Sequence, residues 1–151
     1  MTHKAFVHLF ILSLWAPPVL AQSVGRAPKG YDPATETSIA GTILQVVSAA
    51  APDGSVGVHI TVKTTAGATV KVHLAPAMFI GMNNFFFMAD DTVAVRGAYV
   101  SHDDEVALWA RQVTKGSETL TLRSEDGTPR WPFATAEDPD GCGIPHAPIR
   151  Y

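Results

Sequence analysis

Two histidines, His59 and His73, are the residues whose type and spacing most clearly suggest chemistry. They lie in segments 56–64 and 68–74, which alternate apolar and polar residues and are joined by a three-residue loop. In a hairpin with that loop, counting back from the turn places His59 directly opposite His73. Directly opposed residues have Cβ atoms about 4.5–5.5 Å apart, which lets two imidazoles share one metal ion.

The same register predicts which face the two imidazoles occupy. Ile60 and Val72 oppose each other inward, so both histidines stand on the outer face of the sheet. Two ligands hold an ion poorly, and His102 and Asp103 in a later loop are candidates to complete the shell. Imidazole with carboxylate suits zinc, copper(II) or nickel rather than calcium. The alternative is a solvated or mutually stacked surface pair without a cofactor.

Two lysines extend this outer face into a candidate ligand-binding surface. We expect His59, Lys63, Lys71 and His73 to form a fixed array on the second and third strands. The flanking loops 48–55 and 101–104 would set selectivity. The face offers no outward aromatic side chain on these two strands, which disfavours the base stacking that single-stranded nucleic acid requires.

The elements that must position these residues are strands and one short helix. Gly67 occupies the hairpin position that favours positive φ, and Gly41 and Gly97 indicate bulges or bends within strands. Strands are predicted at 37–47, 56–64, 68–74, 92–100, 105–113 and 118–123, with a helix at 75–82 and a last hairpin closed by Asp126 and Gly127. This order predicts an all-β, OB-fold-like five-stranded Greek-key barrel, with a short helix between strands 3 and 4 and an added C-terminal hairpin.

The predicted helix is apolar, and its side chains allow two interpretations. Met78, Phe79 and Met82, with the phenylalanines at 85–87, resemble a Met and aromatic ligand box. A helix that plugs the open end of a barrel explains them better, because a buried helix is apolar nearly all round.

Outside the barrel, the chain divides into three further segments. Residues 1–21 have the pattern of a secretory signal peptide cleaved after Ala21, and 22–30 form a flexible N-terminal segment before the barrel at 31–131. Residues 132–151 form a Pro-rich irregular tail that contains the only cysteine, Cys142. Cys142 has no internal disulfide partner, so it is a candidate for pairing with another chain or for metal binding with His146.

Charge and motifs limit the function classes. The chain has 11 Lys and Arg against 14 Asp and Glu, and removal of the signal, with Lys4, gives a net charge of −4. An acidic chain is a poor general nucleic-acid binder. We find no nucleophile elbow, phosphate-binding glycine loop or metalloprotease helix, and the signal leaves no membrane span behind.

The sequence therefore predicts a non-enzymatic, periplasmic or secreted binding module. Its partner would be a small ligand, a metal ion such as zinc or copper, or an envelope protein, bound on the face of strands 2 and 3. The alternatives are a metal-binding protein that uses the histidine pair, a single-stranded nucleic-acid binder, and a structural accessory subunit of an envelope complex.

Three stretches also resemble a known family. HLAPAMF from His73, ADDTVAVRG, and the block from Ala107 to Trp131 resemble small exported bacterial OB-fold proteins. The resemblance implies a periplasmic OB-like domain over Tyr31 to Trp131, in a family often labelled nucleic-acid-binding by fold analogy. Asp90 stands where that family usually has glycine.

Overall fold

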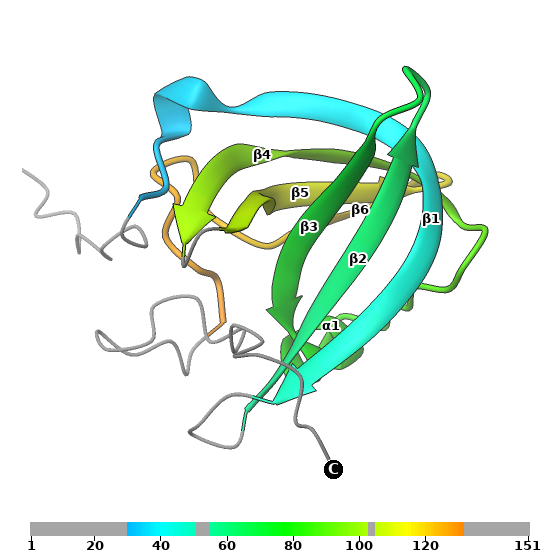
Figure 1. The fold of residues 1–151 in the computed structure, drawn as a ribbon. Helices are drawn as coiled ribbons and strands as arrows, with labels where there is room; N and C mark the ends of the chain where they lie inside the picture. Colours follow the sequence, from blue (N-terminus) through cyan, green and yellow to red (C-terminus); the bar gives the residue numbers. More distant parts are fainter. Residues whose placement is uncertain (1–29, 51–54, 103–104, 132–151) are drawn as a thin grey trace, which may run out of the picture.

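The computed structural model describes residues 30–50, 55–102 and 105–131 (Figure 1). The predicted signal and tail, with Cys142, lie outside these ranges. The described elements are η1 (Pro33–Thr35), β1 (Thr37–Ala50), β2 (Val56–Thr64), β3 (Thr69–Pro76), α1 (Ala77–Met82), β4 (Thr92–His102), β5 (Glu105–Lys115) and β6 (Glu118–Thr121).

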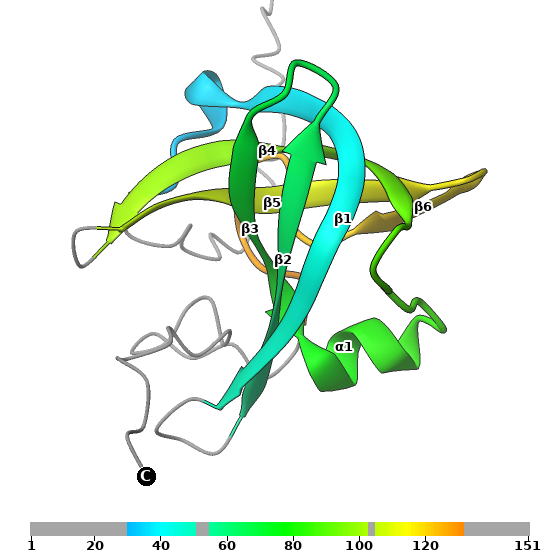
Figure 2. The same cartoon turned by 45° about the vertical axis from the view of Figure 1, so that its right-hand side comes forward.

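The strands of the described chain form one sheet that closes into a barrel. Their order is β3-β2-β1-β4-β5-β6, with every neighbouring pair antiparallel. A short parallel pairing of β3 with β5 closes the sheet, through Val72 opposite Leu108 and His73 opposite Trp109. Figures 1 and 2 show β1 curving around the barrel, with β6 added beside β5. The predicted OB-fold-like barrel with an added strand is confirmed.

The long strand β1 serves both halves of the barrel. Its first residues pair with β4 and its later ones with β2, and Gly41 pairs with both. The backbone approaches so closely that a Cβ on Gly41 would lie 2.1 Å from the carbonyl oxygen of Lys63. The bulge expected at Gly41 instead falls between Ile43 and Gln45, where the extra residue keeps Ile43 and Val46 both toward the core.

The β2–β3 hairpin has the predicted register. His59 pairs with His73 and Ile60 pairs with Val72. Gly67 in the connecting turn has φ +88°, as expected for that position. The strands run longer than predicted, however: β3 continues through Pro76 and β4 through His102, so the loops beside them are shorter. Pairing to neighbours on both sides extends the strands beyond what their alternation indicates.

The barrel core consists of the inward residues of all the strands. Fully buried members are Ile43, Val62, Val72, Leu74, Leu108, Val113 and Leu122. A second buried cluster forms on the other face of β4 and β5, from Tyr31, Ala98, Val100, Ala107 and Trp109. Burial of apolar area at roughly 25 cal/mol per Å² is the main source of stability in a chain with so few charged residues.

The helix α1 lies at the end of the barrel where β3 finishes (Figure 2). Ile80 is its only buried residue. The expectation of a helix buried all round is wrong, because Met78 and Met82 are 60% and 70% exposed. Pro76 is the residue before the helix rather than part of its first turn. Its φ of −57° suits that position, and its missing N–H leaves no helix donor unpaired.

After β6 the chain makes one more hairpin and ends the described region. Arg123 pairs with Pro129 in an isolated bridge, and the turn between them contains Gly127, as predicted. Trp131 then packs edge-on against Phe79 of α1, with ring centroids 5.7 Å apart, and is 2% exposed. This hairpin therefore fastens the last described residue to the barrel end.

Candidate functional site

A row of directly paired residues crosses the outer face of the barrel. Val47 pairs with His59, His59 with His73, His73 with Trp109, and Trp109 with Ala98. Paired residues project from the same side of a sheet, so these five side chains lie side by side across five strands. We call them the histidine row.

The two histidines at its centre contact each other. Their ring centroids are 4.4 Å apart, and the ring planes meet at 79°, an edge-to-face arrangement. The predicted pairing is confirmed, and so is the predicted face. The expected surface position is wrong, because His59 is 9% and His73 8% exposed. The pair therefore forms a covered contact rather than a solvated one.

Trp109 explains part of that burial. Its indole lies nearly parallel to the His73 ring, at 13° and with centroids 5.8 Å apart. The guanidinium of Arg123, which is fully buried, lies 5.4 Å from the Trp109 ring centroid, 5.8 Å from that of Tyr31 and 4.9 Å from that of Trp131. The contact between His73 and Trp109 could not be predicted from the sequence, because β3 and β5 meet only where the barrel closes.

The environment keeps His73 uncharged at neutral pH. Burial and then the neighbouring His59 lower the pKa of His73 to about 4, and Arg123 and Lys71 act in the same direction. The carboxylate of Glu105 opposes them. The neutral imidazole is the form that binds metal ions. Of the described groups, Nδ1 of His73 is a buried atom with no hydrogen-bond partner.

The lysines of the predicted array lie on the same outer face but do not form a positive surface. Lys71 pairs with Glu105 at 2.8 Å, and both side chains are substantially exposed. The hydrogen bond from Lys71, helped by the charge of the same lysine, outweighs burial and lowers the pKa of the Glu105 carboxyl. Lys63 is exposed near the hairpin turn. The charge of Lys71 is balanced by Glu105, and Lys63 alone does not make the basic groove that a nucleic-acid backbone requires.

The structure does not bring the four predicted metal ligands together. His102 ends β4 opposite Glu105, while Asp103 and the side chain of His102 lie outside the described residues. Within the described ranges, no group of three or more His, Cys, Asp or Glu residues is placed to hold a metal ion. The roles of His102 and Asp103 remain predictions.

A second candidate surface lies at the barrel end, where the sequence predicted only core. Met78, Met82, Phe86 and Met88 are 60%, 70%, 67% and 65% exposed. We call these four residues the methionine–phenylalanine surface. Met78 and Met82 are four residues apart in α1 and so share one side of the helix. The apolar composition of this stretch was visible in the sequence, but its exposure was not.

A pocket of about 190 Å³ adjoins this surface. Its walls come from β1, β2, α1 and the segment that follows the helix, and they are mostly apolar, with Ser48 as the polar side chain among them. Phe86 belongs both to the pocket lining and to the exposed surface. Other lining residues are Val46, Val58, Ala77, Ile80, Phe85 and Phe87.

The segment after α1 is held in place by hydrogen bonds. Lys115 donates from Nζ to the carbonyl oxygen of Phe86 and pairs with Asp91 at 3.0 Å. The Asp91 carboxylate also accepts from the backbone N–H of Met88 at 2.8 Å. That backbone bond, followed by Lys115, lowers the pKa of Asp91. The exposed side chains of Phe86 and Met88 therefore project from a fixed backbone.

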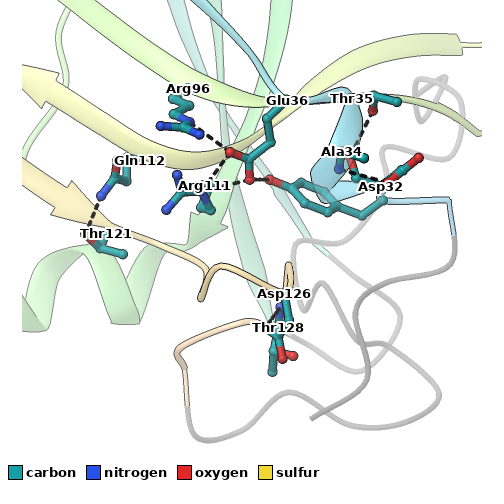
Figure 3. Close-up of polar contacts among 11 residues, drawn as sticks. Asp32, Ala34, Thr35, Glu36, Arg96, Arg111, Gln112, Thr121, Asp126 and Thr128 are labelled. Carbon is teal, nitrogen blue, oxygen red and sulfur yellow. Dashed lines mark hydrogen bonds and ion pairs between the residues drawn. The ribbon is translucent and has the colours of Figure 1, made fainter. Parts of the chain in front are cut away.

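A buried ion pair fastens the start of β1 to β4 and β5 (Figure 3). The Glu36 carboxylate accepts from Nε of Arg96 at 2.8 Å, from Nε of Arg111 at 2.7–3.0 Å, and from the Tyr31 hydroxyl at 2.8 Å. Burial alone would raise the pKa of Glu36, but the hydrogen bonds from Tyr31, Arg111 and Arg96 outweigh it and hold the pKa below its ordinary value. Burial and the contact with Glu36 raise the pKa of Tyr31. Tyr31, Arg96 and Arg111 all donate hydrogen bonds to Glu36, so we interpret this cluster as stabilising the fold and not as a binding site.

Fold and surfaces together define a small closed β-barrel of OB type whose distinctive features are a covered histidine pair and an exposed apolar barrel end. Residues 35–120, more than half of the chain, match the MamS/MamX magnetosome protein family. The chain belongs to this family.

The dimeric N-terminal domain of PriB from Thermoanaerobacter tencongensis is similar over 56% of this chain and 99% of that one, with 9% identity and a TM-score of 0.43. No curated protein matches the chain. In the described part of the chain, no helix has the length and apolar character needed to cross a membrane.

Proposed function

We propose that this chain is a non-catalytic protein-binding module that docks onto another magnetosome protein through the methionine–phenylalanine surface. The observation that carries the proposal is the exposure of four large apolar side chains beside an apolar pocket. Large exposed apolar side chains that gather at one end of a domain are typical of interaction sites in soluble proteins. The family name supports the choice of a magnetosome partner.

The pocket suits one apolar anchor from the partner. An apolar cavity of about 150 Å³ holds a benzene ring, so the 190 Å³ beside Phe86 accommodates a leucine, methionine or phenylalanine side chain. Such anchors in well-packed pockets carry most of the free energy of an interface. The flexible thioethers of Met78, Met82 and Met88 can adapt around the anchor.

The hydrogen bonds that Lys115 and Asp91 make to the backbone of Phe86 and Met88 also favour binding. Since they fix this backbone in the free protein, docking does not have to order this segment. A preorganised surface loses less conformational entropy on association, and the saving appears as affinity. Binding of this kind requires no catalytic group, and we retain the prediction of a non-enzymatic protein.

Export is part of the proposal because residues 1–21 have the pattern of a secretory signal. The module would then act in the periplasm or beyond it. The ligand face predicted on β2 and β3 is not the docking surface in this proposal. Its histidines are covered, whereas the barrel end is open.

The test begins with a photo-crosslinking amino acid at Met82, in cells that build magnetosomes. The matched control carries the same group at Lys63, which is also exposed and lies near the end of β2, next to the hairpin turn. The β2–β3 turn lies away from α1 (Figure 2). A protein crosslinked from position 82 and not from 63 is then purified. Its affinity is measured for the unsubstituted chain and for Met82→Ser, Phe86→Ser and Lys63→Ser.

We expect the two serine variants at the barrel end to bind at least about tenfold more weakly, which is the effect of losing one well-packed anchor contact. Lys63→Ser should bind as the unsubstituted chain does. Equal affinities across all three folded variants would overturn the proposal.

A further inference from the structure

We propose that His59 and His73 bind a divalent late transition metal ion, copper(II) or nickel(II) in preference to zinc, on the outer face of the barrel. The site is separate from the docking surface and does not rest on it. It combines a fixed cross-strand pair of imidazoles with the buried Nδ1 atom of His73, which has no hydrogen-bond partner among the described residues.

The backbone brings the two imidazole rings into direct contact. His59 and His73 are directly paired in the β2–β3 ladder, and both strands are held by neighbours on their other edges. Trp109 stacks on His73 and limits rotation of its ring. A metal ion would therefore meet ligands that are already ordered, as in sites where surrounding groups orient the first ligands.

The distance between the rings favours one coordination geometry. With a metal–nitrogen bond of about 2.1 Å and about 1.1 Å more to the ring centre, two imidazoles at 90° have centroids about 4.5 Å apart. At the tetrahedral angle the same bonds give about 5.2 Å. The observed 4.4 Å fits the right angle. Right-angled donors are typical of tetragonal copper(II) and nickel(II), whereas zinc prefers the tetrahedron.

Some of the charged residues around the histidine pair oppose the binding of a cation, and one favours it. Arg123 and Lys71 place positive charge near His73, which opposes a cation, while Glu105 places negative charge near both rings. Glu105 is bound to Lys71 only by an exposed ion pair, which costs little to break. The Glu105 carboxylate would attract a bound dication through its charge and not as a ligand, because within the described ranges no third His, Cys, Asp or Glu residue is placed to hold a metal ion with the pair.

The experiment is equilibrium titration of the untagged full chain with Cu²⁺, Ni²⁺ and Zn²⁺ at pH 7.5, followed by calorimetry and by tryptophan fluorescence. The variants are His59→Phe, His73→Phe and the double variant, which keep aromatic rings in the contact. The matched control replaces three histidines outside the described residues, His3, His8 and His146, by Gln. Thermal melts without metal establish that each variant is folded.

We expect each single phenylalanine variant to bind Cu²⁺ at least about tenfold more weakly and the double variant to take up one ion fewer per chain. The histidine-to-glutamine control should keep that ion, and Cu²⁺ should bind more tightly than Zn²⁺. Glu105→Gln should weaken binding, and Lys71→Ala should not. Unchanged copper uptake by the folded double variant would overturn the proposal, as would loss of all uptake in the control.

Fluorescence gives a readout that does not depend on replacing either histidine. Copper(II) bound at His73 would lie within a few ångströms of the Trp109 indole and would quench its emission. Trp109→Phe, which keeps an aromatic ring against His73, should remove most of the copper-induced quenching. Quenching that persists in this variant would place the ion elsewhere and contradict the proposal.

Discussion

The imidazole of His73 lies flat against the indole of Trp109, with ring planes 13° apart and centroids separated by 5.8 Å. The two residues belong to β3 and β5, which meet only where the barrel closes. This contact covers a histidine that the hairpin alone would leave on an open face. Its energetic consequence is that His73 must stay neutral in the folded chain.

Acidification should therefore destabilise the protein in a defined window. The pKa of His73 is about 4 when folded and 6.5 when exposed, so the unfolded chain binds more protons between these values. The stability from the neutral ring is complete above pH 6.5 and is lost as the pH falls toward 4. From pH 8 to pH 5 the loss is about 2 kcal/mol, measurable by urea unfolding.

The control for this effect is His73→Phe, which keeps a ring against Trp109 but does not titrate. It should lose about 2 kcal/mol less than the unsubstituted chain over the same pH range. Glu36 and Glu105 do not blur the comparison, because their pKa values lie below the ordinary range and they titrate at lower pH. An identical pH dependence in both proteins would contradict the prediction.

Replacing Glu36 by Gln should cost roughly 3–5 kcal/mol of unfolding free energy. The substitution leaves Arg111, whose side chain is 10% exposed, without its carboxylate. Arg96→Ala removes a partner that is 54% exposed and should cost less than about 1 kcal/mol. Chemical denaturation of the two variants measures the difference. Equal losses of unfolding free energy in the two variants would show that the buried ion pair between Glu36 and Arg111 does not stabilise the fold more than the exposed contact with Arg96.

Gly97→Ala should destabilise the barrel by about 3 kcal/mol or more. A Cβ at this position would lie 2.0 Å from the carbonyl oxygen of Trp109, so β4 and β5 would have to separate at their bulge. Gly81→Ala in α1 is the matched control, because a Cβ there meets nothing within 4 Å. It should stabilise the chain by up to about 1 kcal/mol. Thermal melts of the two variants should therefore shift in opposite directions.

Asp90→Gly should raise the stability by about 0.5 kcal/mol. Asp90 has φ +70°, a left-handed conformation that glycine adopts without steric cost. Its backbone N–H donates to the carbonyl oxygen of Ile43 at 2.8 Å, so the turn cannot relax to a more common conformation without losing that bond. Asp90→Val should instead lose about 1–2 kcal/mol. If Asp90→Val melted at a higher temperature than Asp90→Gly, the prediction that the backbone at Asp90 is strained would be wrong.

The features that the sequence predicted correctly are local or periodic. The register of His59 against His73 followed from a three-residue turn and from alternation in two short strands. The positive φ at Gly67 followed from the same turn. The order of strands and helix was enough to predict the barrel, because short connections and one helix between the third and fourth strands restrict the topology.

What the sequence alone determined, then, is the element order, the hairpin register and the faces on which the residues of the β2–β3 hairpin lie. The tertiary structure alone decided which faces are covered. Trp109 reaches His73 from 36 positions along the chain, and Arg96 and Arg111 reach Glu36 from 60 and 75 positions away. Alternation assigns a side chain to one face of a strand, but burial of that face depends on what barrel closure brings against it. For the same reason Met78, Met82, Phe86 and Met88, apolar enough for a core, are exposed, since no described element packs over the outer side of α1.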